Sequence, residues 1–299
     1  MALLNALESN TIFFLISVIL LSLSVGSFLN VVIYRLPIML KSSWRAQCIE
    51  YMTSEANADQ SNLNTDGEPE KFNLATPRSR CPSCGHPITA MENIPVVSYL
   101  ILKGRCSKCK SPISVRYPIV ETATAVLSAI VALHFGFSWQ CLTALLLTWS
   151  LIVLTMIDFD HKLLPDDITL SFLWMGILLS LFGWFTDTNS SIIGAIAGYL
   201  ALWSVYWAFK LLTGKEGMGY GDFKLLAMLG AWMGWQALPG IVLLSSFVGA
   251  IVGVSLIVFR GRDKNIPIPF GPYLATAGWI YLLWGHSISS WYFSISGIK

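Results

Sequence analysis

Long stretches without a charged residue dominate this sequence. Residues 11 to 34 contain no Asp, Glu, Lys or Arg, which is enough helix to cross the roughly 30 Å hydrocarbon core of a bilayer. Further uncharged stretches occupy 122 to 157, 168 to 186, 188 to 209, 225 to 259 and 265 to 298. Hydrophobic residues make up 55% of the chain and charged residues 12%, and the mean hydropathy is +0.63. The sequence therefore predicts an all-α polytopic membrane protein in contact with a lipid bilayer.

About eight membrane helices follow if two of these stretches each hold a pair. Residues 122 to 157 are long enough for two helices with a turn at Gly136 to Ser138, and 225 to 259 hold two if the chain reverses around 234 to 240. The sixth helix is then expected to begin at Asp222 and to have only about fifteen apolar residues, which is short for a full crossing.

A polar segment separates the first span from the others. Charged residues, Asn, Ser and Pro accumulate between 37 and 113, and apolar runs are short there. We therefore expect a first membrane helix over 1–36, a polar domain over 37–113 and a membrane bundle over 114–299. Arg35 and Pro37 are expected to close the first span. The part from Ser42 to Pro77 is typical of a flexible loop.

The basic residues predict the orientation in the membrane. Nine of the nineteen Lys and Arg lie between Lys41 and Lys110. With eight spans, the loops on the same side hold the later basic residues, and only Lys299 falls on the other side. This bias places the polar domain in the cytosol and both termini opposite. The net charge of +2 is too small to indicate a nucleic-acid partner. The basic residues in the later loops on the cytosolic side are Lys162, Lys210, Lys215, Lys224, Arg260, Arg262 and Lys264.

Four cysteines in the polar domain form two C-x-x-C pairs. Cys81 and Cys84 make the first pair, Cys106 and Cys109 make the second, and 21 residues lie between the pairs. Thiols stay reduced in the cytosol, and four thiolates on two tight turns fit a structural zinc site like that of a zinc ribbon. Unligated thiols are the alternative. Such a closed site has no open coordination position, so its expected role is to fold a domain with little apolar core.

Two aspartates are predicted to meet at the cytosolic ends of membrane helices. Asp158 lies at the end of the third span and Asp222 at the start of the sixth. Carboxylates at a membrane boundary are costly when unpaired and are therefore candidates for function. Where two carboxyl groups share one proton, the ionised member can deprotonate a water while the protonated member polarises a peptide carbonyl. This is aspartic-protease chemistry. The alternative for Asp222 is a simple N-cap.

Alternate glycines precede the second aspartate in Gly217-Met218-Gly219-Tyr220-Gly221-Asp222. Glycine permits backbone conformations barred to other residues and lets another chain approach closely, so Gly219 and Gly221 are expected to support the site. The N-terminus of the sixth helix is expected to favour the anion at Asp222. Asp160, Asp166 and Asp167 are interpreted as solvated loop or cap residues.

The combined pattern resembles the type IV prepilin peptidase/N-methyltransferase family, whose members are GxGD-type intramembrane aspartyl proteases. The resemblance implies that Asp158 and Asp222 are the catalytic pair. It implies cleavage of type IV prepilins and type II secretion pseudopilins after a glycine, on the cytosolic side of the bacterial inner membrane. It also implies N-methylation of the new first residue, usually Phe, from S-adenosylmethionine. The matching stretches are Gly26 to Val32, Arg35 to Pro37, both cysteine pairs, Glu92 to Pro95, Ile157 to Asp167, Gly217 to Lys224 and Pro267 to Ala275.

The methyl transfer has no visible site in the sequence. No strand followed by G-x-G-x-x-G occurs, so a Rossmann-type cofactor site is not predicted. The family places this activity with the cytosolic insert, which makes Glu92 and Gly104 candidates for cofactor binding, although a surface charge and a turn are the simpler interpretations. Three other functions stay open: a proton-coupled transporter with the aspartates as a relay, a membrane-tethered zinc-ribbon scaffold, and a peptidase without methyl transfer.

Overall fold

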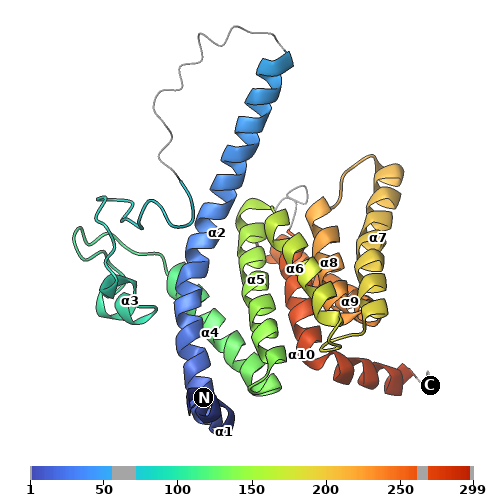
Figure 1. The fold of residues 1–299 in the computed structure, drawn as a ribbon. Helices are drawn as coiled ribbons and strands as arrows, with labels where there is room; N and C mark the ends of the chain where they lie inside the picture. Colours follow the sequence, from blue (N-terminus) through green and yellow to red (C-terminus); the bar gives the residue numbers. More distant parts are fainter. Residues whose placement is uncertain (1, 56–71, 261–268, 297–299) are drawn as a thin grey trace. The chain divides into compact units, whose positions relative to one another are not determined.

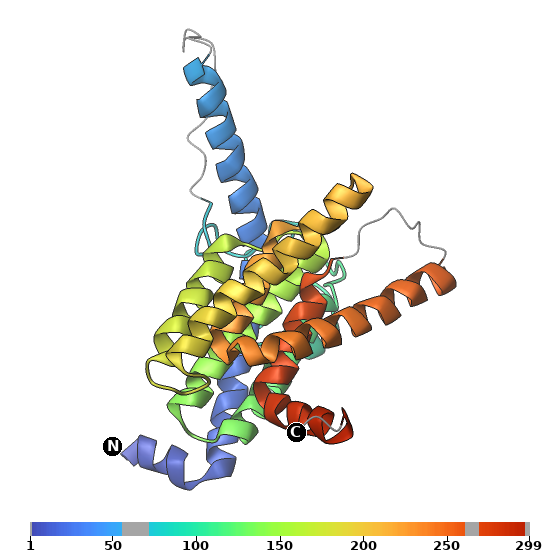
Figure 2. The same cartoon turned by 90° about the vertical axis from the view of Figure 1, so that its right-hand side faces the viewer.

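The computed structural model describes residues 2–55, 72–260 and 269–296 (Figure 1), and Figure 2 shows the same helices from the side. Over these residues the chain is helical, and its extended parts form only isolated bridges. The predicted all-α class is confirmed. The longer helices are α2 (Thr11–Glu55), α4 (Arg116–Phe135), α5 (Trp139–His161), α6 (Asp166–Ser180), α7 (Thr188–Thr213), α8 (Tyr220–Met233), α9 (Leu238–Arg260) and α10 (Gly271–Ser296); the shorter ones are α1 (Ala2–Ser9), α3 (Val97–Ile101) and the 3₁₀ turns Met91–Asn93 and Trp235–Ala237.

The longer helices follow one another in the order of the predicted spans. Within the described ranges, five helical segments are long and apolar enough to cross a membrane, and they comprise α2, α4, α5, α7 and the segment Trp235–Leu256. α6 has 15 residues and α8 has 14, so both are shorter than a usual crossing. The chain is therefore a multi-pass membrane protein, while the count of eight spans stays a prediction.

The first membrane helix does not end where we expected. α2 continues through Arg35 and Pro37 as far as Glu55. A proline inside a helix removes one hydrogen bond but keeps a helical φ, and the residues that follow include the helix-favouring Leu, Lys, Arg, Ala and Gln. The expectation of a loop from Ser42 is therefore wrong as far as Glu55. Residues 56–71 of that predicted loop lie outside the described residues, as do Arg262, Lys264, Lys299 and the first two residues of the matching stretch Pro267 to Ala275.

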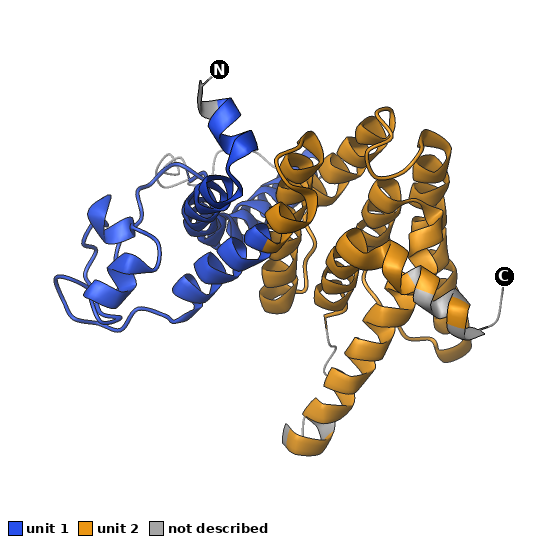
Figure 3. Cartoon of the chain, turned by 90° about the horizontal axis from the view of Figure 1, so that it is seen from below, with its two compact units in different colours: residues 1–129 blue, residues 130–299 orange. Residues whose placement is uncertain are grey.

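The chain separates into two compact units (Figure 3). Unit 1 comprises residues 1–129 and unit 2 comprises residues 130–299, with the boundary inside α4. Unit 1 contains the cysteine pairs, and unit 2 contains both predicted catalytic aspartates. The division at 36 and 113 stays a prediction.

α8 is the buried helix of unit 2. Every residue from Leu225 to Trp232 is buried. α7 approaches α8 through glycine, because a Cβ on Gly198 would lie 2.7 Å from the carbonyl oxygen of Leu226. On another side, Trp232 Nε1 donates a hydrogen bond to the carbonyl of Phe172 in α6 at 2.8 Å. Small residues on α7 and one large residue on α8 thus fix the helix that carries Asp222.

Candidate active site and metal centre

Asp158 and Asp222 lie at two helix ends of unit 2. Asp158 is in the last turn of α5, which ends at His161 and is followed by Lys162 in a left-handed conformation. Asp222 is the third residue of α8, whose N-cap is Gly219. The alternative that Asp222 is an N-cap is therefore wrong, because the helix begins at Tyr220 and the carboxylate lies inside its first turn.

Both carboxyl groups are buried, and the residues beside them meet at Leu164. Asp158 is 6% exposed and Asp222 is 7% exposed. A Cβ on Gly271 would contact both Asp158 Oδ2 and Leu164, and one on Gly221, the residue before Asp222, would also contact Leu164. Asp158 Oδ2 and Asp222 Oδ1 have no hydrogen-bond partner among the described residues. Buried carboxylate oxygens without partners are costly, so purely structural aspartates rarely keep them. The arrangement suits a pair that binds a water or a substrate group.

Leu164 and two glycines bring three segments together at this pair. A Cβ on Gly221 would lie 2.8 Å from Leu164 Cβ, and one on Gly271 would lie 2.5 Å from Asp158 Oδ2. Leu164 is itself buried. The absence of a side chain at both glycines therefore lets the starts of α8 and α10 approach the end of α5. We did not single out Gly271 from the sequence, although its position in Phe270-Gly271-Pro272 at the start of an uncharged stretch was a usable signal.

The glycine loop supports the site by close packing, not by unusual backbone angles. Gly219 has φ −85° and ψ 150°, which any residue can adopt. A Cβ on Gly219 would meet only Asp222 Oδ2, at 3.9 Å, whereas one on Gly217 would lie 2.9 Å from the ring of Phe209. The expectation of barred backbone conformations is therefore wrong at Gly219, and the expected close approach occurs at Gly217 and Gly221.

Aromatic residues and an ion pair support the start of α8. The ring centroids of Tyr206, Tyr220 and Phe223 lie 5.3 to 5.7 Å apart. Lys224 Nζ donates to both carboxylate oxygens of Asp166 at 2.7 Å and so joins the start of α8 to the start of α6. The sequence did not suggest these contacts, because they join residues that are distant along the chain.

The four paired cysteines come together in unit 1. Their Sγ atoms all lie within 4.8 Å of one another. Tetrahedral zinc with Zn–S bonds of about 2.3 Å would place its sulfurs about 3.8 Å apart. Cys81 Sγ and Cys109 Sγ are separated by 3.7 Å, so the cluster fits a tetrahedral metal ion. The backbone N–H groups of Ser83 and then Cys84 lower the pKa of Cys81 to about 6. Against a hydrogen bond from the His86 backbone, burial and the neighbouring thiols raise the pKa of Cys84 to about 11, so the clustered sulfurs compete for protons.

The two cysteine hairpins have the same backbone hydrogen bonds. In the first, Cys81 N–H donates to the carbonyl of His86 at 2.9 Å, and Gly85 N–H donates to the carbonyl of Cys81 at 2.9 Å. In the second, Cys106 N–H donates to Ser111 at 2.9 Å and Lys110 N–H donates back to Cys106 at 3.1 Å. The fourth residue after each leading cysteine has positive φ, 69° at Gly85 and 60° at Lys110. Each hairpin thus presents its two sulfurs in the same way.

Glu92 and Gly104 hold the fold between these hairpins. Glu92 Oε2 accepts hydrogen bonds from the N–H and the hydroxyl of Thr89, both at 2.9 Å, and Thr89 Oγ1 accepts from Glu92 N–H at 3.4 Å. This is a capping box. Hydrogen bonds from Ser107 and then Thr89 lower the pKa of Glu92 to about 2. Gly104 has φ 68°, as a turn requires. The turn at Gly104 matches its simpler interpretation, whereas Glu92 is a hydrogen-bonded structural residue and not a free surface charge. Cofactor binding by either residue stays a prediction.

Two family models match this chain, one mainly within unit 1 and the other within unit 2. Residues 20–135 match the family model for the bacterial peptidase A24 N-terminal domain, and residues 145–254 match the type IV leader peptidase family. A "Prepilin leader peptidase/N-methyltransferase" of Aeromonas salmonicida is 59% identical over 277 residues, which is 93% of each chain. Proteins of the same name from Pseudomonas aeruginosa and Legionella pneumophila are 54% and 46% identical, over 100% of each chain and over 96% of this chain and 98% of the relative, respectively. No solved structure gives a significant match. The chain therefore belongs to the type IV leader peptidase family.

Proposed function

We propose that the protein is a bifunctional membrane enzyme. It cleaves the leader peptide from type IV prepilins and type II secretion pseudopilins after a glycine, and it N-methylates the new first residue, usually Phe, with S-adenosylmethionine. The observation that carries the proteolytic half is the buried pair of Asp158 and Asp222, with one unpartnered oxygen on each. Both activities appear in the printed names of relatives that cover nearly the whole chain.

The aspartates perform the cleavage as an acid and base pair. The ionised carboxylate takes a proton from a water, which attacks the peptide carbonyl, while the protonated carboxyl group donates its proton to the carbonyl oxygen. On collapse of the tetrahedral intermediate, the aspartate that received the water proton gives it to the leaving nitrogen and the C–N bond breaks. The other aspartate takes back a proton from one hydroxyl of the intermediate, so the pair returns to its starting protonation state. The helix start at Asp222 and the helix end at Asp158 hold the two groups in place without using their free oxygens.

We also assign a structural zinc ion to Cys81, Cys84, Cys106 and Cys109. Four thiolates fill a tetrahedral coordination sphere, so this ion folds the module and takes no part in the reaction. S-adenosylmethionine supplies a methyl group for transfer to the neutral amine of the cleaved substrate. The distribution of basic residues supports an inner-membrane location with the active site on the cytosolic side.

Variants of the two aspartates test the proposal. Asp158→Asn and Asp222→Asn should each lower the rate of prepilin cleavage by about 10²–10⁴-fold, since an amide cannot transfer the proton. The matched control is Asp160→Asn, two residues from Asp158 on the same helix but exposed, which should cleave normally. The measurement is cleavage in liposomes with labelled S-adenosylmethionine present.

The same assay separates the two activities. Both aspartate variants should still methylate a pilin that has already been cleaved. Persistent cleavage in either variant would contradict the catalytic pair and would favour the transporter or scaffold functions. Cleavage without methylation by the unmodified protein would mean that the protein is a peptidase that lacks methyltransferase activity.

A further inference from the structure

An apolar segment of unit 1 is exposed between the two cysteine pairs. It comprises Met91 to Leu102, which include a 3₁₀ turn and α3. Met91 is 79% exposed, Leu100 is 68% exposed and Ile101 is 73% exposed. Large apolar side chains that gather on one short segment, outside any core, mark a surface that contacts something other than water.

Glu121 fixes the position of this segment along α4. Its Oε2 accepts a hydrogen bond from Val96 N–H at 2.7 Å, and Glu121 is 8% exposed. Val96 has φ 59°, which is rare for a β-branched residue. Glu121 lies five residues after Arg116, the first residue of α4, and at 1.5 Å per residue Val96 is therefore about 7.5 Å along the helix from its charged start.

α2 gives a second estimate of how far Val96 lies from the charged end of a membrane helix. A Cβ on Gly26 would lie 2.8 Å from the Cα of Glu121, so the two helices touch at this level. Gly26 is nine residues before Arg35, the first charged residue after the apolar stretch of α2, which corresponds to about 13 Å of helix. On α4, Val96 is bonded to Glu121, the last charged residue before the uncharged stretch, and on α2 the same level lies within the apolar stretch. Val96 therefore lies near the cytosolic end of the apolar parts of both helices.

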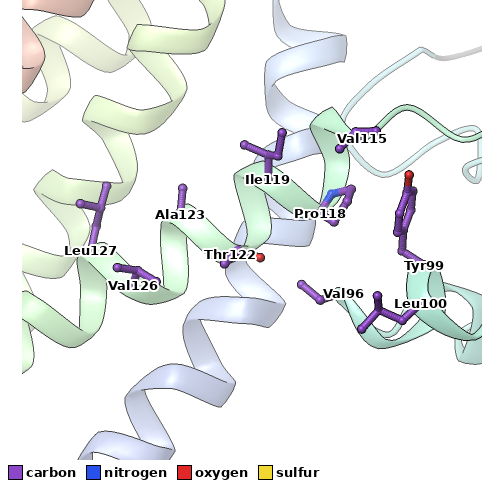
Figure 4. Close-up of a pocket in the computed structure, with 10 residues that line it drawn as sticks. All are labelled: Val96, Tyr99, Leu100, Val115, Pro118, Ile119, Thr122, Ala123, Val126 and Leu127. Carbon is purple, nitrogen blue, oxygen red and sulfur yellow. The ribbon is translucent and has the colours of Figure 1, made fainter. Parts of the chain in front are cut away.

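A groove opens between this segment and α4 (Figure 4). Its volume is about 620 Å³. Val96, Tyr99 and Leu100 line one side, and Ile119, Ala123 and Val126 of α4 line the other. A peptide in an extended conformation would leave N–H and carbonyl groups without partners against such a lining, whereas an acyl chain carries no hydrogen-bonding groups.

Basic residues follow the apolar segment directly. Lys103, Arg105, Lys108 and Lys110 are all exposed. Lysine and arginine near the cytosolic surface of a membrane reach the phosphates of lipid headgroups, while apolar neighbours contact the acyl chains below. The order of apolar residues followed by basic residues suits that arrangement.

We propose that Met91 to Leu102 lie in the cytosolic leaflet of the bilayer and that the groove between α3 and α4 holds the acyl chain of a phospholipid. The headgroup phosphate lies among the basic residues after α3. Interfacial segments of this kind insert about 5–10 Å into the boundary between headgroups and acyl chains. That range includes the distance of about 7.5 Å along α4 and lies below the distance of about 13 Å along α2. This inference rests on the membrane orientation given under the proposed function.

Photocrosslinking tests the proposal on the full chain in liposomes that contain radiolabelled phospholipid. A benzophenone amino acid replaces Leu100, which lines the groove. Leu20, which is 60% exposed within the apolar stretch of α2, is the position that must contact lipid in any membrane orientation. Ala46, exposed on α2 about 16 Å of helix beyond Arg35, is the control outside the bilayer. The Leu100 position should label lipid at least about fivefold more than the Ala46 position.

Each other result has a distinct meaning. Labelling from Leu20 without labelling from Leu100 overturns the proposal and leaves the membrane assignment intact. Absence of labelling at both overturns the membrane assignment as well. A crosslink from Leu100 to added prepilin in place of lipid assigns the groove to the substrate and also overturns the proposal. Ile101 serves as a second position if the change at Leu100 disturbs folding.

Discussion

Two glycines determine how closely other segments approach the buried aspartates. Gly271 lies against Asp158, and Gly221 lies against Leu164, so a single added methyl group would displace either the carboxylate or the loop beside it. Gly219, in contrast, has room for a side chain. Gly219 and Gly221 belong to the same loop, but packing excludes a side chain only at 221. The sequence pattern does not show this difference.

A methyl group at position 221 should destabilise the protein. Gly221→Ala places Cβ 2.8 Å from Leu164 Cβ, and overpacking of this kind costs about 1–3 kcal/mol. We expect a lower unfolding temperature in detergent together with slower prepilin cleavage, because the shift moves the first turn of α8.

Gly219→Ala is the matched control and should leave the unfolding temperature unchanged. Equal unfolding temperatures for Gly221→Ala and the unmodified protein would contradict the packing at Leu164. Slower cleavage by Gly219→Ala at normal stability would show that Gly219 serves the substrate.

At the scale of helices, the uncharged stretches predicted where most membrane helices lie, because the hydrocarbon core excludes charge. They did not predict that α2 continues to Glu55, since a helix outside the membrane needs no apolar run. They also did not show which helices touch. The spacing of Gly194 and Gly198 on α7 was a signal for close helix packing, but the partner helix is known only from the fold.

The contact between α7 and α8 should control the position of Asp222 from two turns away. Gly194→Val would force its side chain against the carbonyl of Gly230 in α8. We expect a loss of about 1–3 kcal/mol of stability, with slower cleavage. Thermal unfolding and the prepilin assay measure these effects.

Ala201→Val, on an exposed face of the same helix, is the control and should behave like the unmodified protein. If the two variants unfold at the same temperature, α7 and α8 do not depend on the glycine contact.

At the scale of the whole molecule, the cysteine cluster and the aspartates belong to different compact units. Spacing predicted the cluster because C-x-x-C pairs fix a local hairpin. No local pattern in the sequence predicts that the aspartates are buried with unpartnered oxygens. Their surroundings come from three separate segments: the starts of α8 and α10 and the loop after α5.

Removal of one cysteine should affect unit 1 first. Cys84→Ser should abolish zinc binding and increase hydrogen exchange over residues 72–115, because a structural zinc site supplies much of the folding free energy of a small module. Exchange in α5 and α8 should change little. Methylation should fall more than cleavage.

Cys48→Ser changes an exposed cysteine outside the cluster and should retain zinc. Normal protection of residues 72–115 in a zinc-free Cys84→Ser protein would overturn the zinc assignment. Loss of protection in α5 and α8 would show that the units do not fold separately.

The two matching hairpins give the candidate metal site two equivalent halves. Each hairpin offers two sulfurs, and neither alone completes a tetrahedron. The 21 residues between Cys84 and Cys106 are not a free linker, because Val96 is bonded to Glu121 of α4. The effective concentration of the second hairpin is therefore set by a fixed geometry and not by chain flexibility. If the cluster binds a metal ion, we expect the two half-sites to act as one tighter site, with the hydrogen bond to Glu121 of α4 adding to the affinity without a contact to the ion.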